Sequence, residues 1–176
     1  MEMKTVKDIR NGFKITEEPI VYYWFFKKDC TDILLAKLKS EIDFNKINRI
    51  DHNNEDYLML YVGKGKNGND RLKKYHILDS NNFHDNGVEN GRLSSLRTTL
   101  CGLLDLPMST SKKAINEFID ENCIVYWKTC SLKNLDKTEE TEITSNYLPL
   151  NYQHTKGILT KEHRKILSSC KKRMRK

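Results

Sequence analysis

A basic segment directly after a glycine is the first place in this sequence where residue types and spacing indicate chemistry. Gly63 ends an apolar run, and residues 64–76 then hold five Lys or Arg side chains and a single acid, Asp70. A strand that ends in glycine and leads into a basic helix can cradle a phosphate, because the backbone can approach the anion closely. The alternative is a solvated basic helix face without a ligand.

Tyrosines and glutamates elsewhere in the chain carry further reactive groups. Tyr22 and Tyr23 lie in an apolar run, where strand alternation puts them on opposite faces, so one can line a site while the other packs. Glu139, Glu140 and Glu142 lie near the start of an expected helix, where acids also stabilise the helix dipole. Each of these residues has an ordinary structural interpretation when it is taken alone.

Together these residues form a pattern that resembles the GIY-YIG nuclease family. Ile20-Val21-Tyr22 stands in the place of the first family triplet, and Tyr61-Val62-Gly63 in the place of the second. Arg71 follows Tyr61 by ten residues, which is the family spacing. Ile20 stands where the family has glycine, which leaves Tyr23 as a rival to Tyr22.

The third part of the pattern lies nearer the end of the chain. Five residues there resemble the closing motif of the family, E-x-x-L-x-x-x-Y-x-P-x-x-N: Glu140, Ile143, Tyr147, Pro149 and Asn151. Helical phase favours Glu140, because positions 140, 143 and 147 share one face of a helix. Glu139 and Glu142 remain rivals. The resemblance covers about residues 19–152.

The resemblance implies metal-dependent hydrolysis of phosphodiester bonds. Glu140 would hold one divalent cation, Mg²⁺ or Mn²⁺, because carboxylate oxygens suit hard metals. Arg71 would bind the phosphate through its permanently charged guanidinium. Tyr22 or Tyr61 would deprotonate or orient the attacking water.

Other residues would support this chemistry. Lys64 or the metal would supply the positive charge that a tyrosine needs to act as a general base, and His76 or Tyr75 would assist. Asn151 would orient Glu140 or a tyrosine. A further set is expected to contact DNA: Gly63, Lys66, Lys73, Lys74, Arg97, Lys171, Lys172 and Arg173.

Hydropathy patterning places these residues on an α/β (α+β) scaffold. Three apolar runs predict strands over 20–26, 57–63 and 123–129. Amphipathic periodicity predicts helices over 32–42, 71–78, 92–106, 112–119, 137–147 and 158–174, with polar loops over 43–55 and 79–91. The expected fold is a small central three-stranded, mainly antiparallel sheet flanked by helices, similar to the GIY-YIG fold.

Charge is distributed unevenly over three expected regions. The chain of 176 residues has a net charge of +7, and residues 161–176 alone carry that excess. We expect an N-terminal extension over 1–18, a nuclease domain over 19–152 with an insertion at about 27–55, and a basic helical tail over 153–176. Such a tail on a neutral body indicates a polyanion such as nucleic acid, or an anionic membrane surface.

Several function classes are excluded by composition. The chain has no apolar stretch long enough to span a membrane and no signal peptide. Its five cysteines contain no C-x-x-C pair, which favours a reducing cytoplasm. We expect DNA as the partner and no membrane association.

The sequence thus predicts a metal-dependent DNA endonuclease, compact and site-specific, of the restriction or defence type. The alternative is a nucleic-acid-binding module on the same fold without catalysis. A palindromic target would require two active sites, and hence a homodimer or sequential nicking. A protein that only binds nucleic acid needs no carboxylate beside the phosphate, so the predicted carboxylate favours the endonuclease over the binding module.

Overall fold

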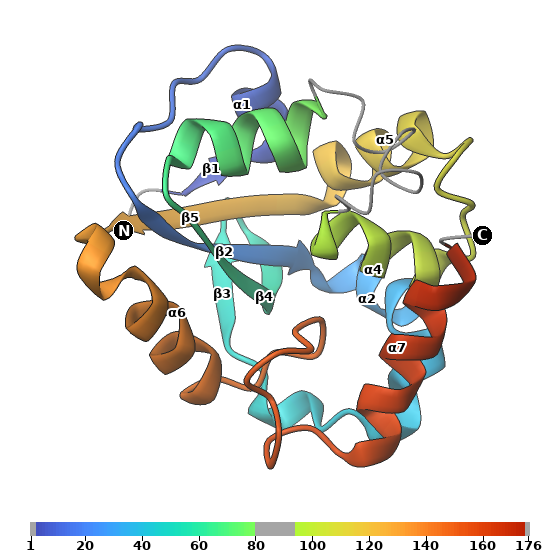
Figure 1. Ribbon diagram of the computed structural model, residues 1–176. Helices are drawn as coiled ribbons and strands as arrows, with labels where there is room; N and C mark the ends of the chain where they lie inside the picture. Colours follow the sequence, from blue (N-terminus) through green and yellow to red (C-terminus); the bar gives the residue numbers. More distant parts are fainter. Residues whose placement is uncertain (1–2, 80–93, 175–176) are drawn as a thin grey trace.

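An apolar and aromatic run forms the central strand of the fold. In the computed structural model, which describes residues 3–79 and 94–174, this run is β2 (Ile20–Lys27), and all but its last residue is buried. A strand that is buried on both faces is continuously hydrophobic rather than alternating. β2 accordingly lies in the middle of the sheet, with a partner strand on each side (Figure 1).

The sheet has five antiparallel strands, so the expectation of three was wrong. Their order is β1-β5-β2-β4-β3, and the four other strands are β1 (Lys4–Thr5), β3 (Arg49–His52), β4 (Glu55–Gly65) and β5 (Cys123–Thr129). β1 has only two residues, too few for a periodic pattern. β3 lies in a polar segment and pairs with β4 through a turn in which Asn53 and Asn54 both have positive φ, as tight hairpins require.

Pairing between β2 and β4 decides which tyrosines share a face of the sheet. Tyr22 lies opposite Gly63 and Trp24 opposite Tyr61, but beyond Trp24 the register shifts and leaves Leu60 without an opposite residue on β2. Such a β-bulge re-aims the neighbouring side chains. Leu60 and Tyr61 would alternate in a regular strand, yet both join the hydrophobic cluster that contains Tyr22.

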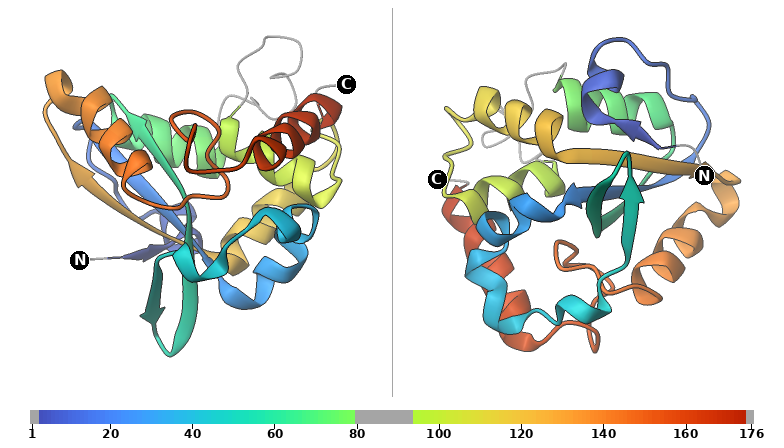
Figure 2. Two further views of the ribbon diagram at one scale, coloured as in Figure 1. Left: turned by 90° about the horizontal axis from the view of Figure 1, so that it is seen from below. Right: turned by 180° about the vertical axis from the view of Figure 1, so that it is seen from behind.

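Helices cover both faces of the sheet. The cluster that contains Tyr22 is covered by α1 (Val6–Arg10), α2 (Lys28–Leu34), a π-helix (Asn69–Leu78), α4 (Ser95–Leu104), α5 (Lys112–Asn122) and α7 (Lys161–Met174). The opposite face is covered by α6 (Leu135–Thr144), which lies apart from α4, α5 and α7 (Figures 1 and 2). Short 3₁₀ helices occupy 36–41, 44–46 and 132–134.

Each segment expected to be helical contains a helix, with some ends shifted. The expected helix over 32–42 is divided between α2 and a 3₁₀ helix, and the segment at 71–78 is a π-helix. The loop expected at 79–91 lies outside the described residues from position 80 onward. No helix in the described part of the chain is long and apolar enough to cross a membrane.

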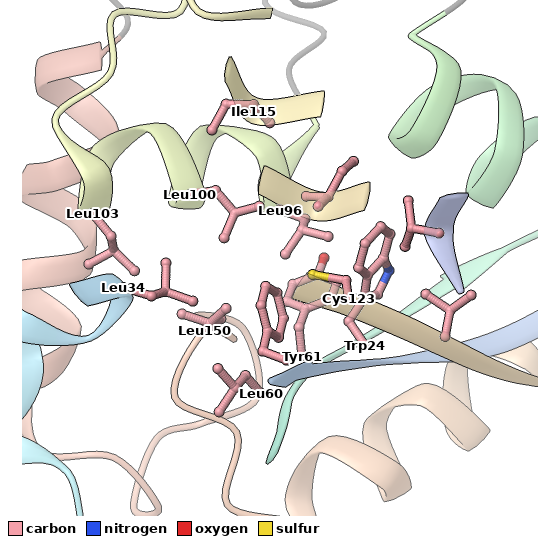
Figure 3. Close-up of a cluster of buried hydrophobic side chains, with 14 of the residues drawn as sticks. Trp24, Leu34, Leu60, Tyr61, Leu96, Leu100, Leu103, Ile115, Cys123 and Leu150 are labelled. Carbon is pink, nitrogen blue, oxygen red and sulfur yellow. The ribbon is translucent and has the colours of Figure 1, made fainter. Parts of the chain in front are cut away.

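Both terminal segments pack into the core. Val6 and Ile9 of α1 are fully buried, so residues before position 19 contribute to the same hydrophobic cluster as the sheet. Leu167 and Cys170 of α7 are buried in it as well. Figure 3 shows part of this cluster, in which side chains from β2, β4, α2 and α4 meet Leu150. The basic helix is therefore fixed to the domain along its apolar face.

The close packing of α4 against α7 depends on a missing side chain. A Cβ atom at Gly102 of α4 would lie 2.7 Å from the backbone carbonyl carbon of Cys170 in α7. Real Cβ atoms do not approach backbone this closely, so α4 and α7 could not pack at this distance with any other residue at 102.

We predict that Gly102→Ala destabilises the protein by about 1–3 kcal/mol, the usual range for overpacking. In an exposed helix the same change would stabilise by up to about 1 kcal/mol, because alanine has the higher helix propensity. Thermal unfolding followed by circular dichroism measures the effect, with Ser169→Ala on the exposed side of α7 as the control. An unfolding temperature at or above that of the wild type would contradict the packing argument.

Candidate active site

A pocket of about 330 Å³ opens where β2, β4, the π-helix and α6 meet. Six residues of its lining come from the sequence motifs: Tyr22, Tyr61, Gly63, Lys64, Arg71 and Glu139. Asp136 and Gln153 also line it, and the sequence analysis did not assign them to the site. Ser95, from the start of α4, lines it as well. Residues that are up to 131 positions apart in the chain thus share one cavity.

Tyr22 begins a buried chain of hydrogen bonds. Its hydroxyl lies 2.7 Å from Nε2 of His76, and Nδ1 of His76 lies 2.7 Å from Oγ of Ser94. Ser94 also caps α4, since its Oγ accepts from the backbone N–H of Arg97. Gly63 is needed beside this chain, because a Cβ atom there would lie 2.6 Å from the Tyr22 hydroxyl oxygen.

Burial keeps the imidazole of His76 neutral. The ring is fully buried, and its desolvation, together with the nearby charges of Arg71 and Arg97, lowers its pKa well below 6.5. A neutral imidazole has one donor and one acceptor nitrogen. With Nδ1–H directed to Ser94, Nε2 can accept a hydrogen bond from the Tyr22 hydroxyl.

Arg71 lies near both tyrosines of the motifs. Burial raises the pKa of Tyr22 to about 12, while the charge and the hydrogen bond of Arg71 act against this rise. Burial raises the pKa of Tyr61 as well, and Arg71 again opposes the effect. The guanidinium also stacks 4.3 Å above the ring of Tyr75. This cation therefore favours the ionised form of each neighbouring phenol and is itself held in one orientation.

The π-helix explains why Arg71 and His76 reach the same tyrosine. Its i→i+5 hydrogen bonds align residues that are five positions apart, whereas an α-helix aligns positions three or four apart. π-helical turns are frequent at functional sites. In an α-helix, with 3.6 residues per turn, Tyr75 rather than His76 would lie on the same face as Arg71. No pattern in the sequence indicates that this segment is a π-helix.

Among the three glutamates of α6, Glu139 is the one in the pocket. Its side chain is 13% exposed and pairs with Nζ of Lys64 at 2.5 Å. Glu140 is 59% exposed and lies 3.5 Å from the imidazole of His154, and Glu142 pairs with Lys128 on the other side. The structure thus places the rival Glu139, rather than Glu140, beside the motif residues.

Helix geometry accounts for this difference. Leu135 and Ile143 are buried against the sheet, and Glu139 lies midway between them at i+4 spacing, so it shares their face. The phase argument for Glu140 depended on Tyr147, but α6 ends at Thr144, and Tyr147 lies beyond the helix.

Asn151 acts on the backbone rather than on the pocket side chains. Its Oδ1 accepts from the N–H of Val62 at 2.9 Å, and its Nδ2 donates to the carbonyl of the same residue at 2.8 Å. Leu150 N–H also donates to the carbonyl of Leu60. These bonds hold the segment after α6 against β4, next to Tyr61, so Asn151 is a positioning residue.

Tyr23 faces the opposite side of the sheet. It stacks against Tyr126 and lies under the ammonium of Lys128, in the cluster that α6 covers. The structure therefore favours Tyr22 as the tyrosine of the first triplet. Alternation along β2 separates the two rings by the full thickness of the sheet.

The residues expected to contact DNA differ in their surroundings. Lys66 lines the pocket, whereas Lys73 donates to the carbonyl of Phe13 and Lys74 pairs with Asp70. The expectation for Arg97 requires correction. Its side chain is buried and donates to the backbone carbonyl of His76 and to the side chain of Asn116. It therefore supports the hydrogen-bond chain through the backbone of His76.

The tail lysines lie near the pocket. Lys171 and Lys172 line a second cavity that adjoins it. Arg173 lies in the last turn of α7, and its side chain is outside the described part of the structure.

The donor set of the pocket fits a hard divalent cation. Mg²⁺ is commonly bound through one or two carboxylates, with water and substrate phosphate completing the octahedron. Glu139 and Asp136 supply two carboxylates, and both are within ion-pair distance of Lys64. The residues described by the structure contain no preformed cluster of three or more His, Cys, Asp or Glu side chains. A cation here would therefore depend on substrate oxygens for much of its coordination.

We predict that the neutral His76 makes folding stability depend on pH. The folded state keeps the ring unprotonated, while the unfolded chain binds a proton below about pH 6.5, so stability falls as the pH drops through that value. The slope from one such group approaches about 1.4 kcal/mol per pH unit. Chemical denaturation of wild type and His76→Gln between pH 7.5 and 5 measures it.

His163, whose pKa burial also lowers, is present in both proteins, so the difference between the two curves isolates His76. Parallel curves for the two proteins would contradict a neutral, buried His76.

Comparison with known proteins agrees with this geometry. A family model described as the GIY-YIG catalytic domain matches residues 20–173, which include every motif residue named above and nearly all of α7. No curated protein and no solved structure matches the chain. Because the match spans most of the chain and the two tyrosines, the arginine and a glutamate meet in one pocket, the chain belongs to the GIY-YIG family of nuclease domains.

Proposed function

We propose that this protein is a metal-dependent endonuclease that hydrolyses phosphodiester bonds in DNA. The observation that carries the proposal is the carboxylate of Glu139 in the same pocket as Arg71, Tyr22 and Tyr61. A site that only binds phosphate gains nothing from an adjacent carboxylate, because like charges repel. A site that must hold a cation against a phosphate needs one.

Arg71 and Glu139 would bind the two charged partners of the reaction. The guanidinium of Arg71 would hold the scissile phosphate, for which its planar donor geometry is suited. Glu139, with Asp136 nearby, would hold Mg²⁺ or Mn²⁺. That cation would stabilise the negative charge that develops on the phosphate and on the leaving oxygen. When the cation binds Glu139, the ammonium of Lys64 would leave its ion pair with that carboxylate and move toward the phosphate.

The hydroxyl of Tyr22 would orient the attacking water. Its pKa of about 12 keeps the phenol protonated near neutral pH, and its proton is held by Nε2 of His76, 2.7 Å away, so the phenol oxygen can present a lone pair to the water. The lowered pKa of His76 opposes transfer of that proton to the imidazole, so the proton of the water would leave to solvent or to a phosphate oxygen. Tyr61, which also lies near Arg71, would help to orient the water, and Ser94 would hold the imidazole in the required tautomer.

We predict that Tyr22→Phe lowers the cleavage rate constant by about 10²–10³-fold, the usual effect of losing one such group. The change keeps the ring that packs in the core and removes only the hydroxyl that contacts His76. Nicking of supercoiled plasmid under single-turnover conditions with Mg²⁺ or Mn²⁺ measures the rate.

Tyr23→Phe is the matched control, because it removes the same hydroxyl one position away on the opposite face. We expect its rate to stay within about threefold of the wild type. Equal losses in the two variants would contradict the assignment of Tyr22.

The choice of glutamate gives a second matched pair. Glu139→Gln should abolish the metal-stimulated cleavage to below about 1% of the wild-type rate, because the amide is a much weaker ligand for a hard cation. Glu140→Gln, at the exposed neighbouring position, should keep most of the activity. Plasmid cleavage titrated with Mg²⁺ and Mn²⁺ distinguishes a weaker metal affinity from a slower step.

The reverse result, loss with Glu140→Gln alone, would restore the glutamate favoured by the sequence motif. If the wild type binds DNA in a salt-sensitive way but cleaves neither DNA nor RNA, the alternative of a non-catalytic binding module holds.

The finer parts of the proposal concern biological role and assembly. We propose cleavage at defined sites, as in restriction or defence, by a homodimer or by sequential nicking, in the cytoplasm. The sequence supports a reducing compartment, since its five cysteines are odd in number and contain no C-x-x-C pair. Discrete plasmid fragments would support site specificity, and sedimentation of the DNA complex would measure the number of subunits.

A further inference from the structure

A second cavity, of about 280 Å³, adjoins the catalytic pocket. The two share Tyr61, Ser95, Glu139 and Gln153 in their linings, so they form one continuous depression. The far wall of the second cavity comes from α7, through Ser168, Lys171 and Lys172. We call this cavity the α7 cavity.

The lining of the α7 cavity combines three kinds of surface. Ile143 and Leu150 provide an apolar floor, Gln153 and Ser168 provide hydrogen-bonding groups, and two lysines provide positive charge at the side of α7. A free inorganic anion needs no apolar floor. A nucleotide matches all three, because it has an apolar base face, polar base edges and a phosphate.

An aromatic side chain lies beside the wall of the cavity that α7 forms. Tyr152 lines the cavity, is 39% exposed, and has the guanidinium of Arg164 at 4.9 Å and the ammonium of Lys171 at 5.7 Å from its ring centroid. Exposed aromatic rings beside cations are the surfaces on which proteins stack unpaired bases.

The lysines of α7 are held in place by the core. Leu167 and Cys170, directly before them, are buried, and the backbone of Cys170 touches α4 at Gly102. The positions of Lys171 and Lys172 are therefore set by the packing of α7 rather than by a flexible tail. A strand whose phosphate lies on Arg71 would continue past Glu139 into this cavity.

We propose that the α7 cavity binds a nucleotide next to the scissile phosphodiester, with its base on the apolar floor or Tyr152 and its phosphate at Lys171 and Lys172. This inference rests on the proposed nuclease function. It assigns to the basic helix the positioning of one nucleotide, in place of a uniform attraction to the DNA backbone.

The test compares two double variants that remove the same charge from one helix. Lys171→Ala/Lys172→Ala changes the cavity, whereas Lys161→Ala/Lys165→Ala changes two exposed lysines of α7 outside it. Fluorescence anisotropy with a labelled DNA oligonucleotide, single-stranded and duplex, gives the Kd in EDTA, where no metal-dependent cleavage occurs. We expect the first variant to bind about tenfold more weakly, with a salt slope reduced by one to two, which is about one per phosphate contact. The second should change Kd less than about threefold.

A second pair tests the volume of the cavity rather than its charge. Ser168→Trp would fill it, while Ser169→Trp places the same ring on the exposed side of α7. We expect weaker binding with Ser168→Trp alone, at unfolding temperatures that show both variants folded. If Ser168→Trp does not fold, the lysine variants still decide.

Equally weakened DNA binding in the two double lysine variants would overturn the inference. Unchanged DNA binding by a folded Ser168→Trp variant would overturn it as well. In either case α7 would attract DNA only through its overall positive charge. A different result would contradict the proposed nuclease function alone. If the wild type cleaves no DNA while the lysine pairs still differ in EDTA, the nucleotide site stands and the nuclease assignment does not.

Discussion

The β-bulge at Leu60 is the constraint on which the site depends. In a regular antiparallel pair, Tyr61 would follow the alternation of β4 and face the side that α6 covers. The register shift turns it toward Tyr22, and Gly63, two residues on, leaves room for the Tyr22 ring. Asn151 then fixes the same stretch by bonding both backbone groups of Val62. Three local features of one strand thus bring two tyrosines from separate motifs to one cavity.

Burial and charge then divide the roles of the groups around Tyr22. The phenol and the imidazole are both removed from water, which disfavours their charged forms and leaves a neutral pair joined by a 2.7 Å hydrogen bond. The permanent charges of Arg71 and of the Glu139–Lys64 pair line the same pocket as Tyr22. A neutral hydrogen-bonded pair beside fixed charges fits a reaction in which negative charge builds up on phosphate oxygens.

The fold and the site were predictable from the sequence to different depths. The three long strands are continuous apolar runs, and the spacing from Tyr61 to Arg71 is a specific motif, so both were accessible. β1 and β3 were not, because two residues and a polar hairpin carry no periodic signal. The partnership of Arg71 with His76 depends on a π-helix, and helical periodicity assumes 3.6 residues per turn. The glutamate was ambiguous because positions 139 and 140 both lie within a turn of Ile143, and α6 ends at Thr144, before the Tyr147 on which the phase argument for Glu140 depended.

The uneven charge of the chain takes on a different meaning in the structure. The excess of basic residues lies at the end of the sequence, where it resembles a detached tail. Yet α7 has a buried apolar face that crosses α4 at Gly102, and the family match includes nearly all of it. A detached tail attracts DNA from any direction and cannot distinguish one nucleotide from the next. Two lysines on a helix that packs into the core, at the edge of a cavity that shares Glu139 with the candidate active site, would be fixed relative to the phosphate in the proposed reaction, and fixed geometry is what positioning a strand for hydrolysis requires.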